Sequence, residues 1–385
     1  MPYKLLNQKG RARLGELTTR RGKIQTPCFM PIATKGGVKA VTMEDMSALS
    51  PDIILSNTYH LMLRPGEGQI TKLGGFHGLS GWQKPLLTDS GGYQVFSLAK
   101  KRKMTADGVT FNSHIDGKKY LMSPEDSIRI QMAIGSDIMM VLDECVALPA
   151  KRNYVERSVE LTRAWAKRCK DYFVSATDQA NQRNQLNKPN QLLFGIVQGG
   201  LEKDLRIKSA HDLTKIGFDG YAVGGLAVGE EIEQMYSVLD YITDELPSDK
   251  PRYLMGVGYP EQIVEAVKRG VDMFDCVIPT REARHGRLFV IEGGWDERDK
   301  RDRLNILEGD KDFYKKLNIK AEKYQFDETP INADSQFAEL REHSKAYLRH
   351  LFVVEDPTAQ RLATLNNVEF YLNLMRQIRL ELTKG

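Results

Sequence analysis

The segment FDCVIPTREARHG, residues 274–286, gathers several chemically active side chains directly after a short apolar run. Asp275 and Cys276 are adjacent, and both residue types can act as nucleophiles in covalent catalysis. Arg281 and Arg284 follow in the same segment. The residue types alone do not decide which of Asp275 and Cys276 does chemistry, or on what.

Other polar residues and glycines take the same position after other apolar runs. Three of them are acidic, one is a glutamine, and together they are Asp89, Asp143, Gln198, Gly224, Gly225, Gly256, Gly258 and Asp275. The carboxyl ends of parallel strands meet on one face, where barrel enzymes build their sites. Any one of these residues could be an ordinary turn residue or helix cap. Their recurrence favours a shared site, because a semi-buried carboxylate costs free energy without a task or a partner.

Two further stretches bear on the ligand of such a site. Tyr93 follows the Gly91-Gly92 turn in TDSGGYQVFSL, and Met255 precedes another glycine turn in LMGVGYP. An aromatic ring and a thioether on opposite loops could hold a flat heterocycle between them, although a methionine near a strand end is more commonly a core residue. The paired glycines at 199–200 and 224–225 allow a ligand close to the backbone, and neither pair has the form of a phosphate loop.

The order of apolar runs predicts the fold that positions these residues. Seven segments read as buried strands, and they are DIILSNTYHL, PLLTDSGG, DIMMVLDE, LLFGIVQGG, GYAVGGLAVG, RYLMGVG and DMFDCVIPT. Helices are expected between several of them, the clearest being SPEDSIRIQMAIG, with a capping box at Ser123 and Asp126 and a stop at Gly135. This alternation predicts an α/β protein with a closed (β/α)8 barrel, and a doubly wound open sheet is the main rival.

Composition sets wider limits. The chain has 385 residues, 41% of them hydrophobic, and a net charge of +4, which permits a polyanionic partner without requiring one. Its four cysteines show no C-x-x-C spacing, so a disulfide framework is not expected. No stretch approaches the roughly 18 apolar residues of a membrane span. We therefore expect a reduced, cytoplasmic protein with no membrane segment.

The quoted motifs, together with SNTYHLMLRPG, FGIVQGG and MFDCVIPTREARHG, resemble those of the bacterial tRNA-guanine transglycosylases. The similarity runs almost without interruption over residues 1–292 and returns weakly from about 317 to 385. It implies an irregular (β/α)8 TIM barrel that removes guanine from the wobble position of tRNAs with G-U-N anticodons. The base inserted would be preQ1, 7-aminomethyl-7-deazaguanine.

The resemblance also implies a role for each matching residue. Asp275 matches the nucleophile that attacks the anomeric carbon of the ribose, and Asp89 matches the residue that carries the proton lost and gained by the purine. A carboxylate suits the oxocarbenium-like transition state of glycosyl transfer, so Cys276 is expected to pack on the opposite face of the strand. The implied substrate-binding residues are Asp143, Gln198, Gly225, Leu226, Glu230, Tyr93, Met255, Cys145, Val228 and Ser90.

Within that set, Asp143 and Gln198 would bind the purine edge, Gly225 would donate from its backbone, and Tyr93 and Met255 would stack on the base. The Leu226 carbonyl would meet the aminomethyl group, in a peptide oriented by Glu230. Arg281 and Arg284 match contacts to the RNA of the anticodon loop, which arginine's planar fork fits well. In relatives that use queuine, glycine stands at the position of Val228 and valine at that of Cys145. This pair of residues therefore implies preQ1, unless Val228 points elsewhere.

The departure from the family lies near the C-terminus. Alignment on SKAYLRHL places Ser335, Phe337, Leu340 and Asn366 where the family has three cysteines and a histidine that bind zinc. None of them replaces a thiolate or an imidazole, so we expect no metal or other cofactor. Apolar packing would substitute for the zinc.

The domain organisation follows from the extent of the similarity. We expect a catalytic barrel over residues 1–292 and a charged insertion over 293–316. A C-terminal helical subdomain over 317–385 would replace the zinc subdomain, and the polar stretch 175–191 would be a flexible loop.

Partners and alternatives remain open. The expected partners are tRNA, the free bases preQ1 and guanine, and a second copy of the chain. Leu362, Leu365, Leu372 and Met375 recur at helical spacing and would either form the dimer contact or only cover the barrel. The alternatives to this enzyme are a non-catalytic tRNA-binding subunit, or a transglycosylase that uses queuine or another nucleic acid.

Overall fold

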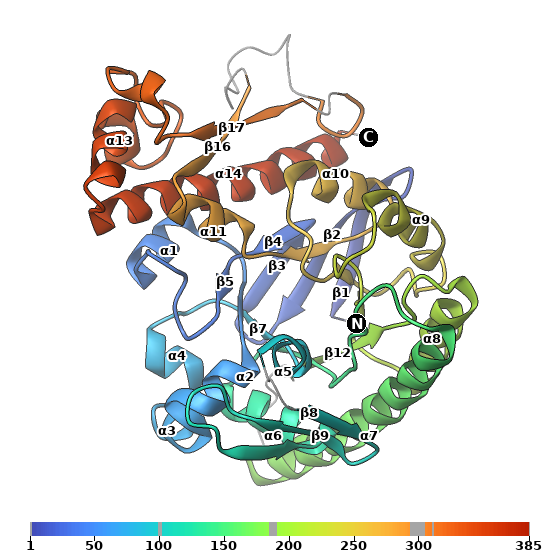
Figure 1. The fold of residues 1–385 in the computed structure, drawn as a ribbon. Coiled ribbons are helices and arrows are strands. Elements are labelled where there is room, and N and C mark those ends of the chain that lie inside the picture. The colour runs from blue at the N-terminus through green and yellow to red at the C-terminus, as the bar shows by residue number, and fades with distance from the viewer. Residues whose placement is uncertain (1, 99–101, 185–190, 293–304, 310–311, 385) are drawn as a thin grey trace.

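Short parallel strands form one curved sheet at the centre of the fold, and helices surround it (Figure 1). The structure is a computed structural model that describes residues 2–98, 102–184, 191–292, 305–309 and 312–384. Within these residues the central sheet has nine strands in the order β4-β15-β14-β13-β12-β11-β7-β6-β5. Their bounds are β4 (Cys28–Met30), β5 (Ile32–Ala33), β6 (Ile54–Ser56), β7 (Leu86–Thr88), β11 (Ile138–Met140), β12 (Leu192–Val197), β13 (Gly220–Val223), β14 (Arg252–Leu254) and β15 (Met273–Asp275).

The two ends of this sheet belong to one chain segment. β4 and β5 are separated only by Pro31, which has no N–H to give to a ladder. β4 pairs in parallel with β15 and β5 pairs in parallel with β6, so the segment closes the sheet into a barrel-like cylinder. All seven strands predicted from apolar runs are confirmed, and the strand order lacks the reversal of a doubly wound sheet. The fold is mixed α/β and TIM-barrel-like.

The helices that follow the barrel strands surround the sheet, and α5 (Gly92–Leu98) lies inside the ring that they form (Figure 1). They are α1 (Met43–Leu49), α2 (Thr58–Leu61), the π-turn η1 (Met62–Gly66), α3 (Glu67–Lys72), α4 (Gly75–Ser80), α5 (Gly92–Leu98), α6 (Pro124–Ile134), α7 (Arg152–Asn184), α8 (Lys203–Ile216), α9 (Ile232–Ile242), α10 (Pro260–Lys268) and α11 (Ile278–Arg284). The capping box at Ser123 and Asp126 and the left-handed stop at Gly135 bound α6 as predicted. Three antiparallel strands, β8 (Arg102–Thr105), β9 (Gly108–Asn112) and β10 (Lys119–Met122), lie between α5 and α6.

The expectation of a flexible loop over 175–191 is wrong for its first part. α7 continues to Asn184, and residues 185–190 lie outside the described part of the chain. Trp165, Cys169 and Phe173 bury one face of the helix and fix its course. Residues 174–184 contain neither proline nor glycine, so no residue of that stretch interrupts the helix.

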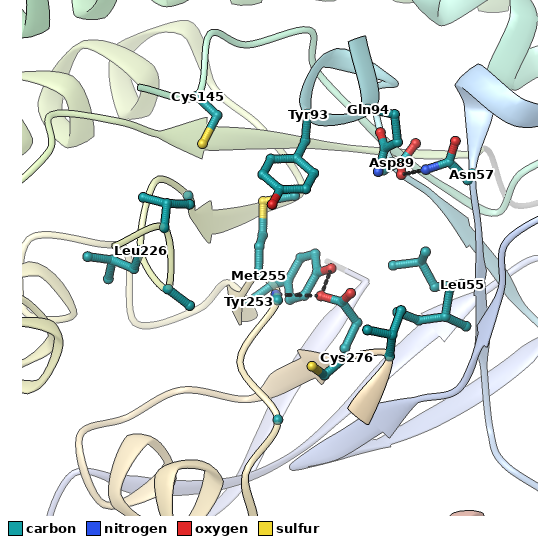
Figure 2. Close-up of a pocket in the computed structure, with 18 of the residues that line it drawn as sticks. Leu55, Asn57, Asp89, Tyr93, Gln94, Cys145, Leu226, Tyr253, Met255 and Cys276 are labelled. Carbon is teal, nitrogen blue, oxygen red and sulfur yellow. Dashed lines mark hydrogen bonds between the residues drawn. The ribbon is translucent and has the colours of Figure 1, made fainter. Parts of the chain in front are cut away.

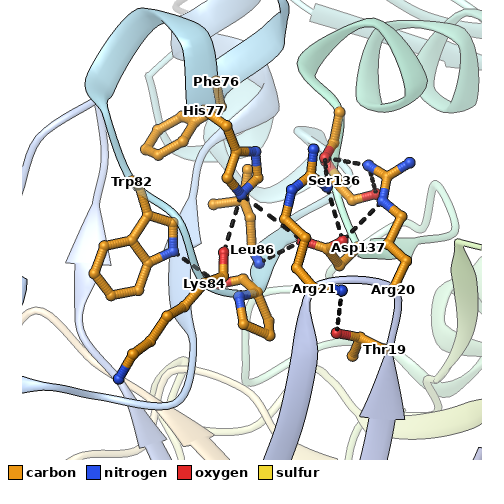
Figure 3. A network of polar contacts seen from close by, with 12 residues as sticks. Thr19, Arg20, Arg21, Phe76, His77, Trp82, Lys84, Leu86, Ser136 and Asp137 are labelled. Carbon is orange, nitrogen blue, oxygen red and sulfur yellow. Dashed lines mark hydrogen bonds and ion pairs between the residues drawn. The ribbon is translucent and has the colours of Figure 1, made fainter.

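A three-stranded antiparallel sheet covers the amino-terminal ends of the barrel strands. It consists of β1 (Tyr3–Lys9), β2 (Ala12–Thr19) and β3 (Gly22–Thr26). Asp137, directly before β11, accepts hydrogen bonds from Arg20 Nε at 2.8 Å and Arg21 Nη1 at 2.9 Å in the network of Figure 3. Its other oxygen accepts the backbone N–H of Leu86 at 2.9 Å. These contacts anchor the bottom of the barrel and leave the carboxyl ends of the strands for a site.

The C-terminal segment packs back on the barrel. β16 (Arg287–Ile291) and β17 (Tyr314–Asn318) form an antiparallel pair across the predicted insertion, of which residues 293–304 and 310–311 lie outside the described residues. The 3₁₀ turn η2 (Glu322–Tyr324), α12 (Ala338–Glu342), α13 (Lys345–Val353) and α14 (Pro357–Thr383) follow.

α14 is anchored to the barrel by both polar and apolar contacts. Tyr371 Oη donates to the Gly258 carbonyl at 2.5 Å, and Asn367 Nδ2 donates to the Pro279 carbonyl at 3.0 Å. Its apolar positions Leu362, Leu365 and Met375 are buried within the chain and Leu372 is half-buried. They therefore cover the barrel rather than offer a free face. Among the described residues, we find no helix long and apolar enough to cross a membrane.

Candidate active site

A cavity of about 520 Å³ opens at the carboxyl ends of the barrel strands. Its volume lies within the roughly 300–1,000 Å³ typical of small-molecule sites. All eight strand-end residues that the sequence singled out line it, and they are Asp89, Asp143, Gln198, Gly224, Gly225, Gly256, Gly258 and Asp275. Because these residues are far apart in the sequence, their meeting is a consequence of the parallel barrel.

Asp275 is the last residue of β15, and its carboxylate is held from one side. The Tyr253 hydroxyl and the Gly256 backbone N–H, the latter at 2.8 Å, both donate to Oδ1. No hydrogen bond from the described residues reaches Oδ2. Burial raises the pKa of Asp275, and the hydrogen bonds from Tyr253 and Gly256 counteract that rise. One oxygen is thus fixed while the other is available to a ligand.

Asp89 follows β7 and is buried in a ring of donors. Thr58 and Gly91 donate backbone N–H groups to Oδ1 at 3.0 and 3.1 Å, and Asn57 Nδ2 donates to Oδ2 (Figure 2). Burial is the main cause that raises the pKa of Asp89 to about 7, and the charges of Asp275 and Asp143 add to it. A carboxyl group that titrates near neutral pH is suited to accept and return a proton.

Asp143 and Gln198 form a hydrogen-bonded pair on the floor of the cavity. Gln198 Nε2 donates to Asp143 Oδ2 at 2.7 Å, and Ser90 Oγ donates to Oδ1 at 3.2 Å. Burial raises the pKa of Asp143 to about 6, against the effect of these two hydrogen bonds. A carboxylate beside an amide offers acceptors and a donor along one edge, which matches the polar edge of a purine.

The loop after β13 follows the cavity wall. Gly225 has a φ of +62°, and a Cβ there would lie 2.3 Å from Gln198 Oε1, so only glycine fits. Glu230 accepts the backbone N–H groups of Ala227 and Val228, the latter at 3.0 Å. Because N–H and C=O point oppositely in a trans peptide, the Leu226 carbonyl is turned away from Glu230.

Other predicted residues complete the lining. Tyr93 on α5 and Met255 after β14 both line the cavity, with 47% of Tyr93 exposed. Cys145 and Val228 also line it, and burial raises the pKa of the Cys145 thiol to about 12. Figure 2 labels Tyr93, Met255 and Cys145 around the cavity, together with Leu226.

Cys276 does not lie on the opposite face from Asp275, as strand alternation predicted. β15 ends at Asp275, so the alternation no longer applies, and Cys276 lines the same cavity. A Cβ on Gly258 would lie 2.2 Å from Cys276 Cβ, so the two residues are tightly packed. Burial raises the pKa of this thiol to about 12, which keeps it in the unreactive neutral form.

The basic residues of α11 differ in exposure. Arg281 is exposed and lines the cavity mouth. Arg284 is partly buried, donates to the Thr280 carbonyl at 2.9 Å and does not line the cavity. Glu230 also stands behind the lining and acts through the loop backbone.

Sequence reasoning missed Tyr253 and Asn57, the side-chain partners of the two catalytic candidates. Asn57 follows β6 just as Asp89 follows β7, so the strand-end rule could have found it. Tyr253 lies inside β14, where a sequence alone gives no sign that its hydroxyl reaches Asp275.

The four positions aligned with zinc ligands have other partners. Ser335 Oγ donates to Glu369 Oε2 at 2.5 Å, and Asn366 Oδ1 accepts from Asn332 Nδ2 at 3.1 Å. Phe337 and Leu340 are buried and carry no donor atom for a metal. Within the described residues, no group of three or more His, Cys, Asp or Glu side chains could hold a metal ion. These residues do not fit a zinc ion.

Comparison with known proteins gives a consistent result over nearly the whole chain. The model of the family described as queuine tRNA-ribosyltransferase matches residues 8–385. The chain is 47% identical over 378 residues to the queuine tRNA-ribosyltransferase of Clostridium botulinum strain Hall, covering 98% of this chain and 94% of that relative. It is 46% identical over 378 residues to the protein of the same name from Clostridium acetobutylicum, with the same coverage.

Proposed function

The chain belongs to the family of queuine tRNA-ribosyltransferases and is a bacterial-type tRNA-guanine transglycosylase of queuosine biosynthesis, and we propose that it inserts preQ1 through a covalent intermediate on Asp275. The substrate would be the wobble guanosine of tRNAs with G-U-N anticodons. The observation that supports this proposal most is the asymmetric carboxylate of Asp275, with Oδ1 held by Tyr253 and Gly256 and Oδ2 unengaged by described residues.

The first half-reaction removes guanine. Asp275 Oδ2 attacks C1′ of the ribose as the bond from C1′ to N9 of guanine breaks. The bonding electrons leave with the purine, which takes a proton from the Asp89 carboxyl group. The products are a glycosyl ester on Asp275, neutral guanine and an ionised Asp89. Two carboxylates with separate roles are what a double-displacement glycosyl transfer requires.

The second half-reaction reverses these steps with another base. Asp89 takes the proton from the ring nitrogen of preQ1, and that nitrogen attacks C1′. The ester bond breaks and returns the Asp275 carboxylate. Two inversions at C1′ preserve the anomeric configuration of the nucleotide.

Base recognition would use the floor of the cavity. The Asp143 carboxylate accepts from the donor edge of the purine, while Gln198 and the Gly225 N–H donate to its carbonyl oxygen. Tyr93 and Met255 would cover the two faces of the ring, and the Leu226 carbonyl would accept from the aminomethyl group. The nucleotide must leave the anticodon stack to reach this depth, as in other enzymes that act on a base.

The RNA itself would approach over α11. Arg281 at the cavity mouth and Arg284 behind it supply positive charge for the anticodon loop. Arg284 bonds a carbonyl of its own helix, so we expect it to contribute less than Arg281. The protein would act in the cytoplasm, where its tRNA substrates are found.

A covalent adduct tests the proposed intermediate. Incubation with a G-U-N tRNA followed by denaturing gel electrophoresis should give a shifted band in the wild type and none in Asp275→Asn. The matched control is Asp178→Asn, an exposed acid on α7, which should retain the band. A chain that forms no adduct and exchanges no guanine would instead be a tRNA-binding subunit.

We further propose that zinc is absent from the C-terminal subdomain and that two copies of the chain pair. The absence of zinc is supported by the hydrogen bonds around Glu369 and by the burial of Phe337 and Leu340 at two of the positions aligned with zinc ligands. The surface available for pairing includes Tyr347 and Val353 of α13, which are 41% and 58% exposed. Light scattering at micromolar concentration distinguishes monomer from dimer.

A further inference from the structure

A buried arginine stands behind the base-binding wall and does not itself line the cavity. Arg206, on the first turn of α8, has 0% of its surface exposed. Its guanidinium donates to four backbone carbonyls: Gly200 at 2.7 Å, Gly224 at 2.9 Å, Gly225 at 3.1 Å and Val197 at 3.3 Å. Three of these carbonyls belong to the glycine pairs that follow β12 and β13, and the fourth belongs to Val197, the last residue of β12.

Arg206 is unusual because its charge has no carboxylate partner. No acidic side chain of the described residues lies within ion-pair distance, and Glu230 acts on it only from farther away. Burial lowers the pKa of Arg206 to about 10, so it stays protonated at neutral pH. A buried charge costs free energy unless it is paired and hydrogen-bonded, and a neutral donor would suffice to brace a loop. The cation therefore needs an explanation beyond packing.

The orientation of the peptides that Arg206 binds explains why a cation is buried there. The peptide that joins Gly224 to Gly225 gives its carbonyl to Arg206, so its N–H, on Gly225, points the opposite way. Gly225 itself lines the cavity. A cation bound to the carbonyl also polarises the peptide and strengthens its N–H as a donor.

From this geometry we propose that Arg206 is a positioning residue for base recognition, which aims and strengthens the Gly225 N–H toward the carbonyl oxygen of the purine. Glu230 holds the same loop from the other end through the N–H groups of Ala227 and Val228. The loop is thus held at both ends, by the Arg206 guanidinium on its carbonyl groups and by the Glu230 carboxylate on its N–H groups. The inference rests on the proposed base exchange and names a residue that acts on it from outside the cavity.

The test compares two buried arginines. Arg206→Lys keeps the charge but loses the planar fork that reaches several carbonyls. The matched control is Arg252→Lys, because Arg252 is also buried and also donates to backbone carbonyls, those of Leu246 and Gly270, at the opposite end of the barrel. Exchange of labelled guanine into tRNA gives kcat and KM, and thermal melting reports stability.

A ligand change separates recognition from folding. 6-Thioguanine keeps the ring N–H groups of guanine but replaces the carbonyl oxygen with sulfur, a weaker acceptor. We expect wild type and Arg252→Lys to prefer guanine over 6-thioguanine by the same factor. Arg206→Lys should raise the KM for guanine about tenfold, the size of one weakened hydrogen bond, and should reduce that preference.

These measurements distinguish failure of the role proposed for Arg206 from failure of the proposed base exchange. If the wild-type chain exchanges no guanine, the base exchange itself is refuted. If it does, an unchanged preference in Arg206→Lys overturns the role of Arg206. A second variant, Arg206→Gln, keeps only a short neutral amide and should show the larger loss. If both variants are insoluble while Arg252→Lys folds, Arg206 is a requirement of the fold, and the proposal is equally overturned.

Discussion

The Tyr253 hydroxyl donates a hydrogen bond to Asp275 Oδ1, the same oxygen that accepts the Gly256 N–H. The two residues lie on adjacent parallel strands, β14 and β15, so the contact is built into the barrel. Two donors on one oxygen leave the other oxygen as the one free to attack. They also lower the pKa of a carboxyl group that burial raises, which keeps more of it ionised.

Replacing Tyr253 by phenylalanine should therefore impair chemistry more than stability. Loss of a hydrogen bond to a charged group costs about 1.5–3 kcal/mol, equivalent to a roughly tenfold to hundredfold lower kcat. Without the donor, the pKa of Asp275 rises further, so the acidic limb of the pH–rate profile should move to higher pH. Steady-state guanine exchange between pH 5 and 9 measures both effects.

The control for this variant is Tyr221→Phe. Tyr221 is buried in β13, and its hydroxyl accepts the Phe218 N–H at the opposite end of the barrel. It should lose a similar amount of stability and retain kcat. A wild-type kcat and an unmoved acidic limb in Tyr253→Phe would show that Gly256 alone positions the nucleophile.

The pH dependence should also contain a falling limb set by Asp89. Its folded pKa is raised to about 7, so the carboxyl group is protonated below that pH and loses its proton as the pH rises through it. Departing guanine needs that proton, so kcat/KM for tRNA should fall by about tenfold per unit at higher pH. The rising limb combines Asp275 and Asp143, because neighbouring carboxyl groups titrate together.

Asp89→Asn cannot titrate and serves as the control for the assignment. It should lose most of its activity, and its residual rate should not fall above pH 7. If this variant still showed a falling limb with the same midpoint, a group other than Asp89 would cause it, and Asp89 would not be the acid.

Much of this site was predictable because of one geometric rule. Carboxyl ends of parallel strands share a face, so Asp89, Asp143, Gln198 and Asp275 could be grouped from strand positions alone. The strands themselves were evident as short apolar runs. The roles of these residues came from family resemblance, which the strand rule does not provide.

What escaped prediction depends on contacts between elements. Tyr253 and Arg206 look like ordinary strand and helix residues until the fold brings them to Asp275 and to the glycine pairs. Cys276 was misplaced because the strand ends one residue before it. Composition alone predicts a loop for the polar end of α7, although tertiary burial earlier in the helix sustains the helix there.

The metal content of the purified protein tests the C-terminal alignment. Ser335, Phe337, Leu340 and Asn366 offer no thiolate or imidazole, so elemental analysis should find no stoichiometric zinc. If no metal is bound, chelator should leave guanine exchange and melting temperature unchanged, because a chain without a metal takes no folding free energy from one. One zinc per chain would overturn the alignment of this region.

Glu369 should carry part of the stability that a metal would otherwise supply. Its carboxylate accepts from Ser335 Oγ at 2.5 Å and from the Gln336 N–H at 2.7 Å. Glu369→Ala leaves both donors without this partner and should cost about 1–3 kcal/mol of unfolding free energy. Glu369→Gln retains one acceptor oxygen and should cost less. Equal unfolding free energies of all three proteins in urea would mean that apolar packing alone holds the subdomain.

The choice of inserted base should depend on Val228. Queuine carries a cyclopentenediol on its aminomethyl nitrogen and needs open space beyond it, whereas preQ1 does not. Val228 is half-buried, lines the cavity and has its N–H fixed by Glu230, which restricts how far the loop can move. A packed side chain imposes a steric penalty that such a wall relaxes poorly. We therefore expect the wild type to insert preQ1 well and queuine poorly.

Shortening the Val228 side chain stepwise should enlarge the cavity stepwise and admit more queuine. Val228→Ala should admit some queuine and Val228→Gly more, because each change removes carbon atoms from the same wall. Glycine also loosens a loop in which Ala227 already has a φ of +57° and Gly229 one of +130°, so a modest rise in the KM for preQ1 is expected. Competition between the two labelled bases on one G-U-N tRNA gives the ratio directly. Equal incorporation of preQ1 and queuine by the wild type would mean that the cyclopentenediol ring of queuine extends out of the cavity beside a residue other than Val228. The proposal of base exchange on Asp275 would not be affected.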